Sequence, residues 1–288
     1  SIVVYAKKEK VKNLLIYDAV NKILNKNKIL APKLINQNYK NNYIEVEDFG
    51  DNTLYKVLKH NKTNKEFFFI KILKTLSRLQ LIKDKQVVNL NRQKYKVQKY
   101  DNKILLNEAK LFSEWYAAIK INKFKIRKFK KMYENEVKKL LSKLNFKNDT
   151  FVHRDFHVSN LMYVKNNIAV IDSQDALIGN KAYDLASLVD DVRFETSNKL
   201  KNKILNNYFK KLKKTEINKF VNDFEILSVL RNLKIIGIFT RLALRDNKKK
   251  YVKMIPYAWE MINYRMKKNR EFVNLKLILK RNFPKFVK

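Results

Sequence analysis

One short segment of the chain contains three side chains that together could bind a metal ion and accept a proton. Asp155 and Asn160 lie five residues apart, and Asp172 follows twelve residues after Asn160. Two apolar runs between them, 161–164 and 168–171, predict a β-hairpin around a three-residue loop. Because a hairpin brings its flanking residues together, Asn160 and Asp172 would offer two hard oxygen ligands suited to Mg²⁺ held against phosphates. Asp155, on the loop that enters the hairpin, would accept a proton from a substrate hydroxyl.

The sequence patterns around this segment predict both helices and strands, which would hold the segment in place. A short strand ends near Ala6, and the alternation at 43–46 predicts a second strand. The turn at 47–51 holds one of only three glycines and is a plausible hinge, which predicts lobes at 1–49 and 50–288. Apolar residues with helical spacing predict helices at 9–25, 65–81, 107–117 and 132–144, and over most of the chain after residue 200.

Composition excludes several classes of protein. The chain has 288 residues and no Cys, so disulfides, thiolate zinc sites and a cysteine nucleophile are excluded. Hydrophobic residues make up 45% of the chain, which is too many for a disordered tail. No apolar run approaches the ~20 residues that span a bilayer, and the first residues lack a signal-peptide pattern. We expect a globular, cytoplasmic protein with no membrane span.

The net charge of +37 raises the alternative of a nucleic-acid or polyanion binder. Only 11 of the 64 cationic residues are Arg, the residue that reads bases and phosphates in a bidentate manner. Lys and Asn are spread along the chain with no single basic block, and no zinc pattern, RNA-reading aromatic motif or basic zipper is present. We therefore interpret the charge as a compositional bias and expect no specific nucleic-acid partner.

The segment 153–160 reads His-Arg-Asp-x-x-x-x-Asn, the spacing of a protein-kinase catalytic loop. With the run 172–176 (Asp-Ser-Gln-Asp-Ala) and the segment 179–188, it resembles the aminoglycoside phosphotransferase and choline kinase superfamily. The Asp-x-Gln-Asp-Ala run is similar to that of the bacterial cell-wall amino-sugar kinases, as are the hinge 47–51 and the helix 107–116. That group uses ATP to phosphorylate the anomeric hydroxyl of N-acetylmuramate and N-acetylglucosamine in peptidoglycan recycling.

The resemblance implies a fold and a role for each site residue. It implies an α+β, protein-kinase-like fold of two lobes, a small N-terminal lobe and a larger, mainly helical C-terminal lobe. Asp155 would be the catalytic base, with Asn160 and Asp172 holding Mg²⁺, and Asp184 would brace the catalytic loop through backbone hydrogen bonds. The other implied positions are His153 and Arg154 in the catalytic loop, Lys7, Glu47 and Asp48 for ATP, and Gln174, Asp175, Glu108 and Trp115 for the sugar.

Other features depart from the pattern of that superfamily. The chain opens on what would be the third strand and has no Gly-rich phosphate loop, so the N-terminal lobe is expected to be partial. Glu108 and Trp115 would also fit an ordinary amphipathic helix, and Ser173 occupies a position that is usually aromatic. A kinase of another small alcohol (an aminoglycoside, choline or homoserine) and a catalytically dead kinase-like protein remain alternatives, although the presence of Asp155, Asn160 and Asp172 argues against the latter.

Overall fold

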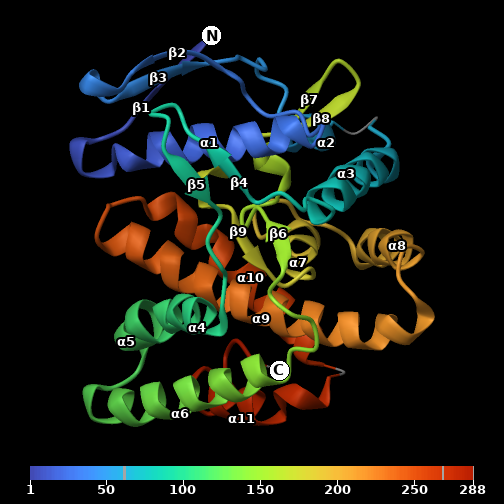
Figure 1. Cartoon of the computed structure of the whole chain (residues 1–288). Coiled ribbons are helices and arrows are strands. Elements are labelled where there is room, and N and C mark those ends of the chain that lie inside the picture. The colour runs from blue at the N-terminus through green and yellow to red at the C-terminus, as the bar shows by residue number, and fades with distance from the viewer. Residues whose placement is uncertain (61–62, 268, 288) are drawn as a thin grey trace. The chain divides into compact units, whose positions relative to one another are not determined.

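The computed structural model describes residues 1–60, 63–267 and 269–287 (Figure 1). The chain forms two compact units. Unit 1 comprises Ser1–Lys99, Asn148–Leu188 and Ser197–Lys211, and unit 2 comprises Tyr100–Lys147, Val189–Thr196 and Leu212–Lys288. The predicted lobe boundary at residue 49 falls within unit 1, and the division into lobes stays a prediction.

Unit 1 begins with an antiparallel sheet packed on a helix. Its strands β1 (Ile2–Tyr5), β2 (Leu34–Asn38) and β3 (Tyr43–Val46) have the order β1-β3-β2. Helix α1 (Lys12–Lys26) runs beneath this sheet in Figure 1, and its Leu14 packs with Ile44 and Val46 of β3. The predicted strands at the N-terminus and at 43–46 are confirmed, whereas β2 was not expected because its sequence, Leu-Ile-Asn-Gln-Asn, is mostly polar.

The predicted hairpin is confirmed as β7 (Leu161–Val164) and β8 (Asn167–Val170). The expected three-residue loop is wrong, because Val164 pairs with Asn167 and leaves only Lys165 and Asn166 in the turn. Both turn residues have positive φ, 44° and 64°, as in the two-residue turns whose twist matches that of the flanking strands.

A second strand pair encloses the loops on either side of this hairpin. Strands β6 (Thr150–Val152) and β9 (Leu177–Gly179) are antiparallel, so the loop 153–160 joins β6 to β7 and the loop 171–176 joins β8 to β9. The other elements of unit 1 are α2 (Leu54–Lys59), α3 (Lys65–Gln80), the hairpin β4 (Gln86–Val88) and β5 (Lys94–Lys96), α8 (Asn198–Phe209), and α7 (Tyr183–Val189), whose last residue belongs to unit 2.

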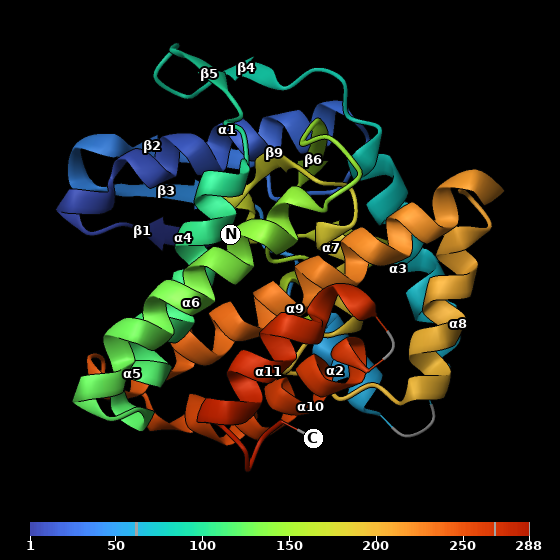
Figure 2. The same cartoon turned by 90° about the horizontal axis from the view of Figure 1, so that it is seen from below.

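Unit 2 is helical (Figure 2). Helix α4 (Asn102–Leu111) continues through a π-helical turn at Phe112–Tyr116 into α5 (Ala117–Lys120), and is followed by α6 (Lys123–Ser142), α9 (Lys214–Leu244), α10 (Ile255–Met266) and α11 (Val273–Asn282). Helix α9 packs against α4 and α10, and α6 packs against α4 and α11. An aromatic cluster fills the core, with Phe112, Tyr116, Phe129, Tyr133, Trp259 and Phe283 in mutual contact.

The predicted helices at 107–117 and 132–144 start earlier in the structure than expected. The side chain of Asp101 accepts a hydrogen bond from the Ile104 amide, and that of Asn122 accepts one from the Phe124 amide. These caps start the helices at Asn102 and Lys123, ahead of the apolar periods. Within the described ranges, no helix is both long and apolar enough to cross a membrane.

Candidate active site

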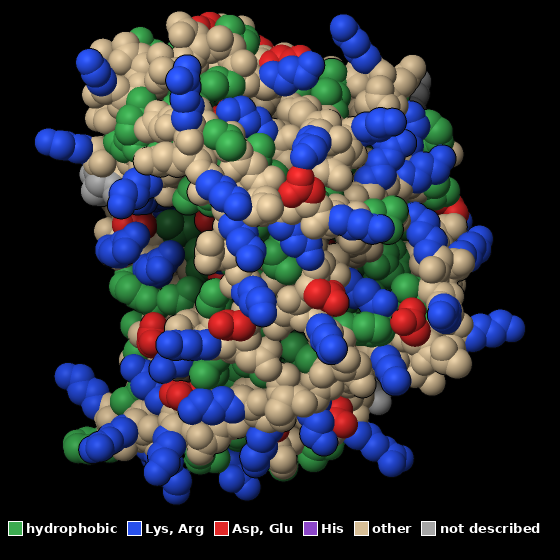
Figure 3. All heavy atoms as spheres, viewed as in Figure 1, with side chains coloured by type: hydrophobic (Ala, Val, Ile, Leu, Met, Phe, Trp, Pro, Cys, Tyr) green, Lys and Arg blue, Asp and Glu red, His purple; other side chains and the backbone are tan. Residues whose placement is uncertain are grey.

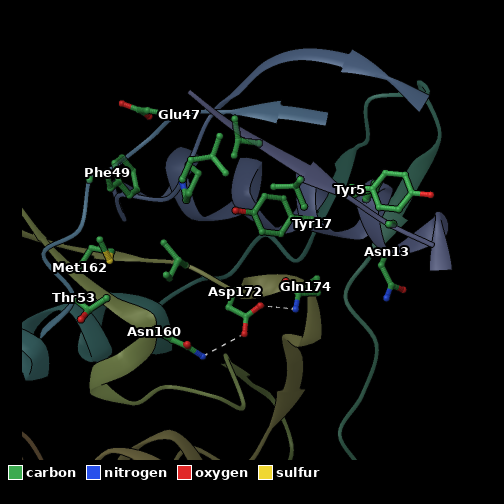
Figure 4. A pocket seen from close by; sticks show the side chains of 18 of the residues that line it. Tyr5, Asn13, Tyr17, Glu47, Phe49, Thr53, Asn160, Met162, Asp172 and Gln174 are labelled. Atoms are coloured by element: carbon green, nitrogen blue, oxygen red, sulfur yellow. Dashed lines mark hydrogen bonds between the residues drawn. The ribbon is translucent and has the colours of Figure 1, made fainter. Parts of the chain in front are cut away.

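The hairpin brings Asn160 and Asp172 together as expected. The Asn160 side-chain amide donates to the backbone carbonyl of Asp155 at 3.1 Å and lies 3.5 Å from Asp172 Oδ2. Gln174 donates to Asp172 Oδ1 at 2.8 Å. Asp172 itself has a left-handed backbone with φ of 60°. Figure 4 shows Asp172 between Asn160 and Gln174, below the ring of Tyr17.

The start of the loop 153–160 is held by Asp184 in the first turn of α7. Its carboxylate accepts the backbone amides of His153, at 2.7 Å, and Arg154, at 3.0 Å. Arg154 has a left-handed backbone with φ of 72°, which is unfavourable for a residue with a Cβ. The two hydrogen bonds that the Asp184 carboxylate accepts therefore stabilise a strained turn directly before Asp155.

His153 is fully buried and its ring contacts the start of the loop 171–176. Burial lowers the pKa of its ring, while the charges of Asp155, Asp172 and Asp175 act in the opposite direction. A neutral ring can donate from Nε2 to the Ile171 carbonyl, 3.0 Å away. By bonding to the Ile171 carbonyl, His153 helps to position the next residue, Asp172.

Arg154 and Asp175 connect the two loops. Arg154 Nη1 donates to the Asp175 carbonyl oxygen at 3.1 Å and lies 3.8 Å from its carboxylate. Burial first, and the Asp175 charge second, raise the pKa of the Tyr95 phenol in β5. The Asp175 side chain is largely exposed and could meet a hydroxylated substrate.

A cavity of about 720 Å³ in unit 1 extends from the β1–β3 sheet to this pair of loops. Its polar end is formed by Asn160, Asp172 and Gln174, and Lys7, Lys10 and Lys56 also line it. The apolar part is lined by Ile2, Val4, Leu14, Tyr17, Pro32, Val46, Phe49, Met162 and Ile171. An apolar slot that ends in a carboxylate and an amide has room for a planar base at one end and charged phosphates at the other.

Of the residues predicted for the nucleotide, Lys7 and Glu47 line this cavity, and Asp48 is not among its lining residues. Lys7 lines it and, in the described part of the chain, forms no ion pair. Glu47 also lines it, but Figure 4 shows its side chain pointing away from Asp172. Asp48 accepts a hydrogen bond from the Gly50 amide at 2.7 Å and so shapes the turn at 48–50.

Sequence reasoning missed a buried link between α1 and the loop 171–176. Ser173 Oγ donates to Asn21 Oδ1 at 2.6 Å, and the Asn21 amide donates to the Pro32 carbonyl at 3.0 Å. Tyr17, one turn before Asn21, has its phenol pKa raised mainly by burial and further by the Asp172 charge. The available signal was a polar Asn within the buried stripe of α1, seven residues after Leu14.

The sugar candidates Glu108 and Trp115 belong to unit 2. The Glu108 carboxylate is 2.8 Å from Lys234 Nζ and accepts a hydrogen bond from the Tyr100 hydroxyl. Trp115 is half-buried in the π-helical turn, a type of turn that is frequent at functional sites. Their predicted place beside the sugar stays a prediction.

The donor set at the polar end of the cavity fits Mg²⁺ bound together with phosphates. The described residues contain no group of three or more His, Cys, Asp or Glu side chains that could enclose a metal by themselves. Asp172 and Asn160 offer two oxygen ligands, and Mg²⁺ in nucleotide sites takes its other ligands from phosphates and water. The arrangement therefore suits a metal that arrives with its nucleotide.

Two curated relatives resemble this chain in sequence. The N-acetylmuramate/N-acetylglucosamine kinase of Neisseria meningitidis serogroup B is 34% identical over 182 residues, 61% of this chain and 54% of the relative. The kinase of the same name from Pseudomonas aeruginosa is 27% identical over 255 residues, 85% of this chain and 71% of the relative. The chain thus spans about half the length of the first of these curated relatives.

The fold has counterparts among solved structures. ADP-bound aminoglycoside phosphotransferase APH(2″)-Ib superimposes with a TM-score of 0.57 at 16% identity, over 90% of this chain and 87% of that one. The chain therefore has the expected protein-kinase-like fold. The profile of the phosphotransferase enzyme family (APH) matches residues 6–216, and the chain belongs to that family.

Proposed function

We propose that this protein is an ATP- and Mg²⁺-dependent kinase that phosphorylates the anomeric hydroxyl of an amino sugar of the N-acetylmuramate or N-acetylglucosamine type. The observation that carries the proposal is the meeting of Asn160 and Asp172 at the polar end of the cavity. The loop that carries Asp155 is held beside them by Asp184. We infer that the reaction takes place in the cytoplasm, where ATP is available.

The chemistry follows from what these residues can do. The apolar slot would hold the base, and Lys7 would lie near the phosphates. Mg²⁺ held by Asn160 and Asp172 would neutralise the charge that develops on the phosphates. Asp155 would orient the acceptor hydroxyl and take its proton while the hydroxyl oxygen bonds to the γ-phosphorus and ADP leaves.

The nature of the acceptor is supported by the named relatives. Both curated relatives described above are kinases of N-acetylmuramate and N-acetylglucosamine. The exposed Asp175 and the adjacent Gln174 offer polar groups that could bind sugar hydroxyls. A kinase of an aminoglycoside, choline or homoserine is the alternative that an acceptor panel must test.

The purified protein should release ADP with N-acetylmuramate and N-acetylglucosamine, and ³¹P NMR should identify the product as a sugar 1-phosphate. Asp155→Asn and Asp172→Ala should each lower kcat by at least about a hundredfold, as expected for a lost proton acceptor or metal ligand. Glu66→Gln is a matched control, because Glu66 is an acid of unit 1 that forms an ion pair with Lys203 and does not line the cavity.

Two outcomes would overturn the proposal in different ways. Full turnover in both Asp155→Asn and Asp172→Ala would exclude the mechanism. Turnover that depends on these acids but occurs only with an aminoglycoside, choline or homoserine would retain the kinase and exclude the amino sugar.

A further inference from the structure

A basic segment stands out at the α5–α6 corner of unit 2. The expectation that the chain has no single basic block is wrong for residues 120–131, where seven of twelve residues are cationic, against 64 of 288 in the whole chain. The seven are Lys120, Lys123, Lys125, Arg127, Lys128, Lys130 and Lys131. No acid occurs between Glu114 and Glu134. A uniform compositional bias does not produce such a local excess.

The structure leaves this charge without compensation. Within the described chain, none of the seven cations has a carboxylate partner; the ion pairs of α6 involve Lys138 and Lys139, further along the helix. Six of the seven side chains are exposed and Lys130 is half-buried. Because like charges at helical neighbours repel each other, this half of α6 is electrostatically unfavourable until it meets an anionic partner.

The same helix also presents apolar surface to solvent. One face of α6 packs into the core of unit 2 through Phe129, Tyr133, Val137 and Leu140. The opposite face carries Phe124 with Arg127, Lys128 and Lys131, at the i, i+3, i+4 and i+7 positions. Phe124 is 94% exposed, and Ile119 at the end of α5 is 55% exposed. In Figure 3, Lys and Arg side chains project at the lower left, where Figure 1 labels α5 and α6.

We propose that the basic α6 face, defined as Phe124, Arg127, Lys128 and Lys131, binds the surface of an anionic lipid membrane. An exposed aromatic ring beside a row of cations on a rigid helix is the combination that inserts at the level of the headgroups while its charges meet lipid phosphates. Nucleic acid fits less well, because six of the seven cations of the segment are Lys and a phosphate groove gives Phe124 no apolar environment.

The test is co-sedimentation of the purified protein with vesicles of phosphatidylcholine alone or with about a third phosphatidylglycerol, at about 0.1 M salt. We expect binding to the anionic vesicles only. Phe124→Ser should weaken it about tenfold, the effect of withdrawing one large apolar side chain from the interface. Lys128→Glu with Lys131→Glu should abolish it.

Matched controls distinguish binding through the basic α6 face from attraction caused by the net charge of the whole protein. Lys213→Glu with Lys214→Glu makes the same charge change at two exposed lysines, and Leu81→Ser removes a side chain that is 74% exposed. Both controls should bind the anionic vesicles as the wild type does. Thermal unfolding of each variant establishes that it is folded.

Three results would overturn the proposal. The first is no sedimentation with anionic vesicles. The second is an equal loss of binding in the Lys213 and Lys214 control, which would mean attraction by net charge alone. The third is binding to duplex DNA that is tighter than to vesicles and equally sensitive to the α6 changes, which would assign the face to nucleic acid.

Discussion

At the scale of single residues, Ser173 is informative because it departs from the usual aromatic residue and yet is fully buried. Its hydroxyl donates to Asn21 Oδ1, so the turn that carries Asp172 is tied to helix α1. Helix α1 also contributes Tyr17 to the cavity. This hydrogen bond thereby links the turn that carries Asp172 to the helix that contributes Tyr17 to the cavity.

We predict that Ser173→Ala lowers the free energy of unfolding by about 1–3 kcal/mol, because Asn21 Oδ1 is left buried without its donor. It should also raise the KM for Mg²⁺-ATP several-fold while the KM for the acceptor is unchanged. Urea unfolding and initial rates measure both effects. Thr75→Val is the control, since that buried hydroxyl bonds only to its own helix.

A double-mutant cycle assigns the effect to the bond. If the losses from Asn21→Ala and Ser173→Ala simply add in the double variant, the two side chains act independently and the positioning argument fails.

His153 provides a prediction about pH. Its pKa in the folded protein lies below the ordinary value near 6.5, first because the ring is buried. Between these two pKa values the unfolded chain binds more protons than the folded one, so stability rises with pH there. The contribution of His153 is present above about pH 6.5 and is lost as the pH falls below it.

Urea unfolding of the wild type and of His153→Gln at several pH values checks this. Gln can still donate to the Ile171 carbonyl but does not titrate in this range. The stability advantage of the wild type should shrink by up to about 1.4 kcal/mol per pH unit below pH 6.5. Parallel curves for the two proteins would contradict the assignment of a neutral, buried ring.

At the scale of elements, the close approach of α9 to the α4 turn depends on Gly237. A Cβ at this position would lie 2.3 Å from the Leu111 carbonyl carbon and 2.6 Å from the Phe112 amide nitrogen, both backbone atoms. We predict that Gly237→Ala lowers the free energy of unfolding by about 2–4 kcal/mol, since the backbone of one helix must shift. Denaturant unfolding measures the loss.

Gly50 is the matched glycine control. It has φ of +73°, and a Cβ added there would have no atom within 4 Å, so Ala meets only backbone strain of about 1–2 kcal/mol. A loss at Gly237 no larger than that at Gly50 would show that the helices adjust without cost.

Some of the helices and strands could be predicted from the sequence and others could not. The hairpin was predictable because two short apolar runs flank a polar turn, and the long helices were predictable because their apolar residues repeat with a helical period. Strands β6 and β9 have three residues each, too few for a period, and are held by pairing between segments 27 residues apart. The turn at Lys165 and Asn166 was misjudged because its length depends on the pairing of Asn167, which the sequence alone does not specify.

The site could be predicted in part for the same reason. Asn160 and Asp172 flank a local hairpin, so their meeting follows from spacing. The bond between Ser173 and Asn21 joins residues 152 positions apart, and only the packing of α1 against the loop creates it. Glu108 and Trp115 belong to unit 2, and their predicted place beside the sugar stays a prediction.

At the scale of the whole molecule, the net charge is +37, yet the site contains several acidic residues. Asp155, Asp172 and Asp175 all act on the His153 ring, so three negative groups gather in a strongly positive molecule. The positive field should attract anionic ligands toward the protein in general. Such attraction affects rates of association and leaves the choice of reaction to the site.

The positive electrostatic field of the protein should affect two acceptor substrates differently. N-acetylmuramate carries a carboxylate and N-acetylglucosamine does not, so only the former gains from long-range attraction. Raising NaCl from about 0.01 M to about 0.15 M shortens the Debye length from about 30 Å to about 8 Å. The ratio of kcat/KM for N-acetylmuramate to that for N-acetylglucosamine should therefore fall several-fold, as measured by ADP release at saturating Mg²⁺-ATP. Because both acceptors use the same nucleotide and metal, the effects of salt on those ligands cancel in the ratio. A ratio that does not change with salt would mean that the surface charge plays no part in acceptor capture.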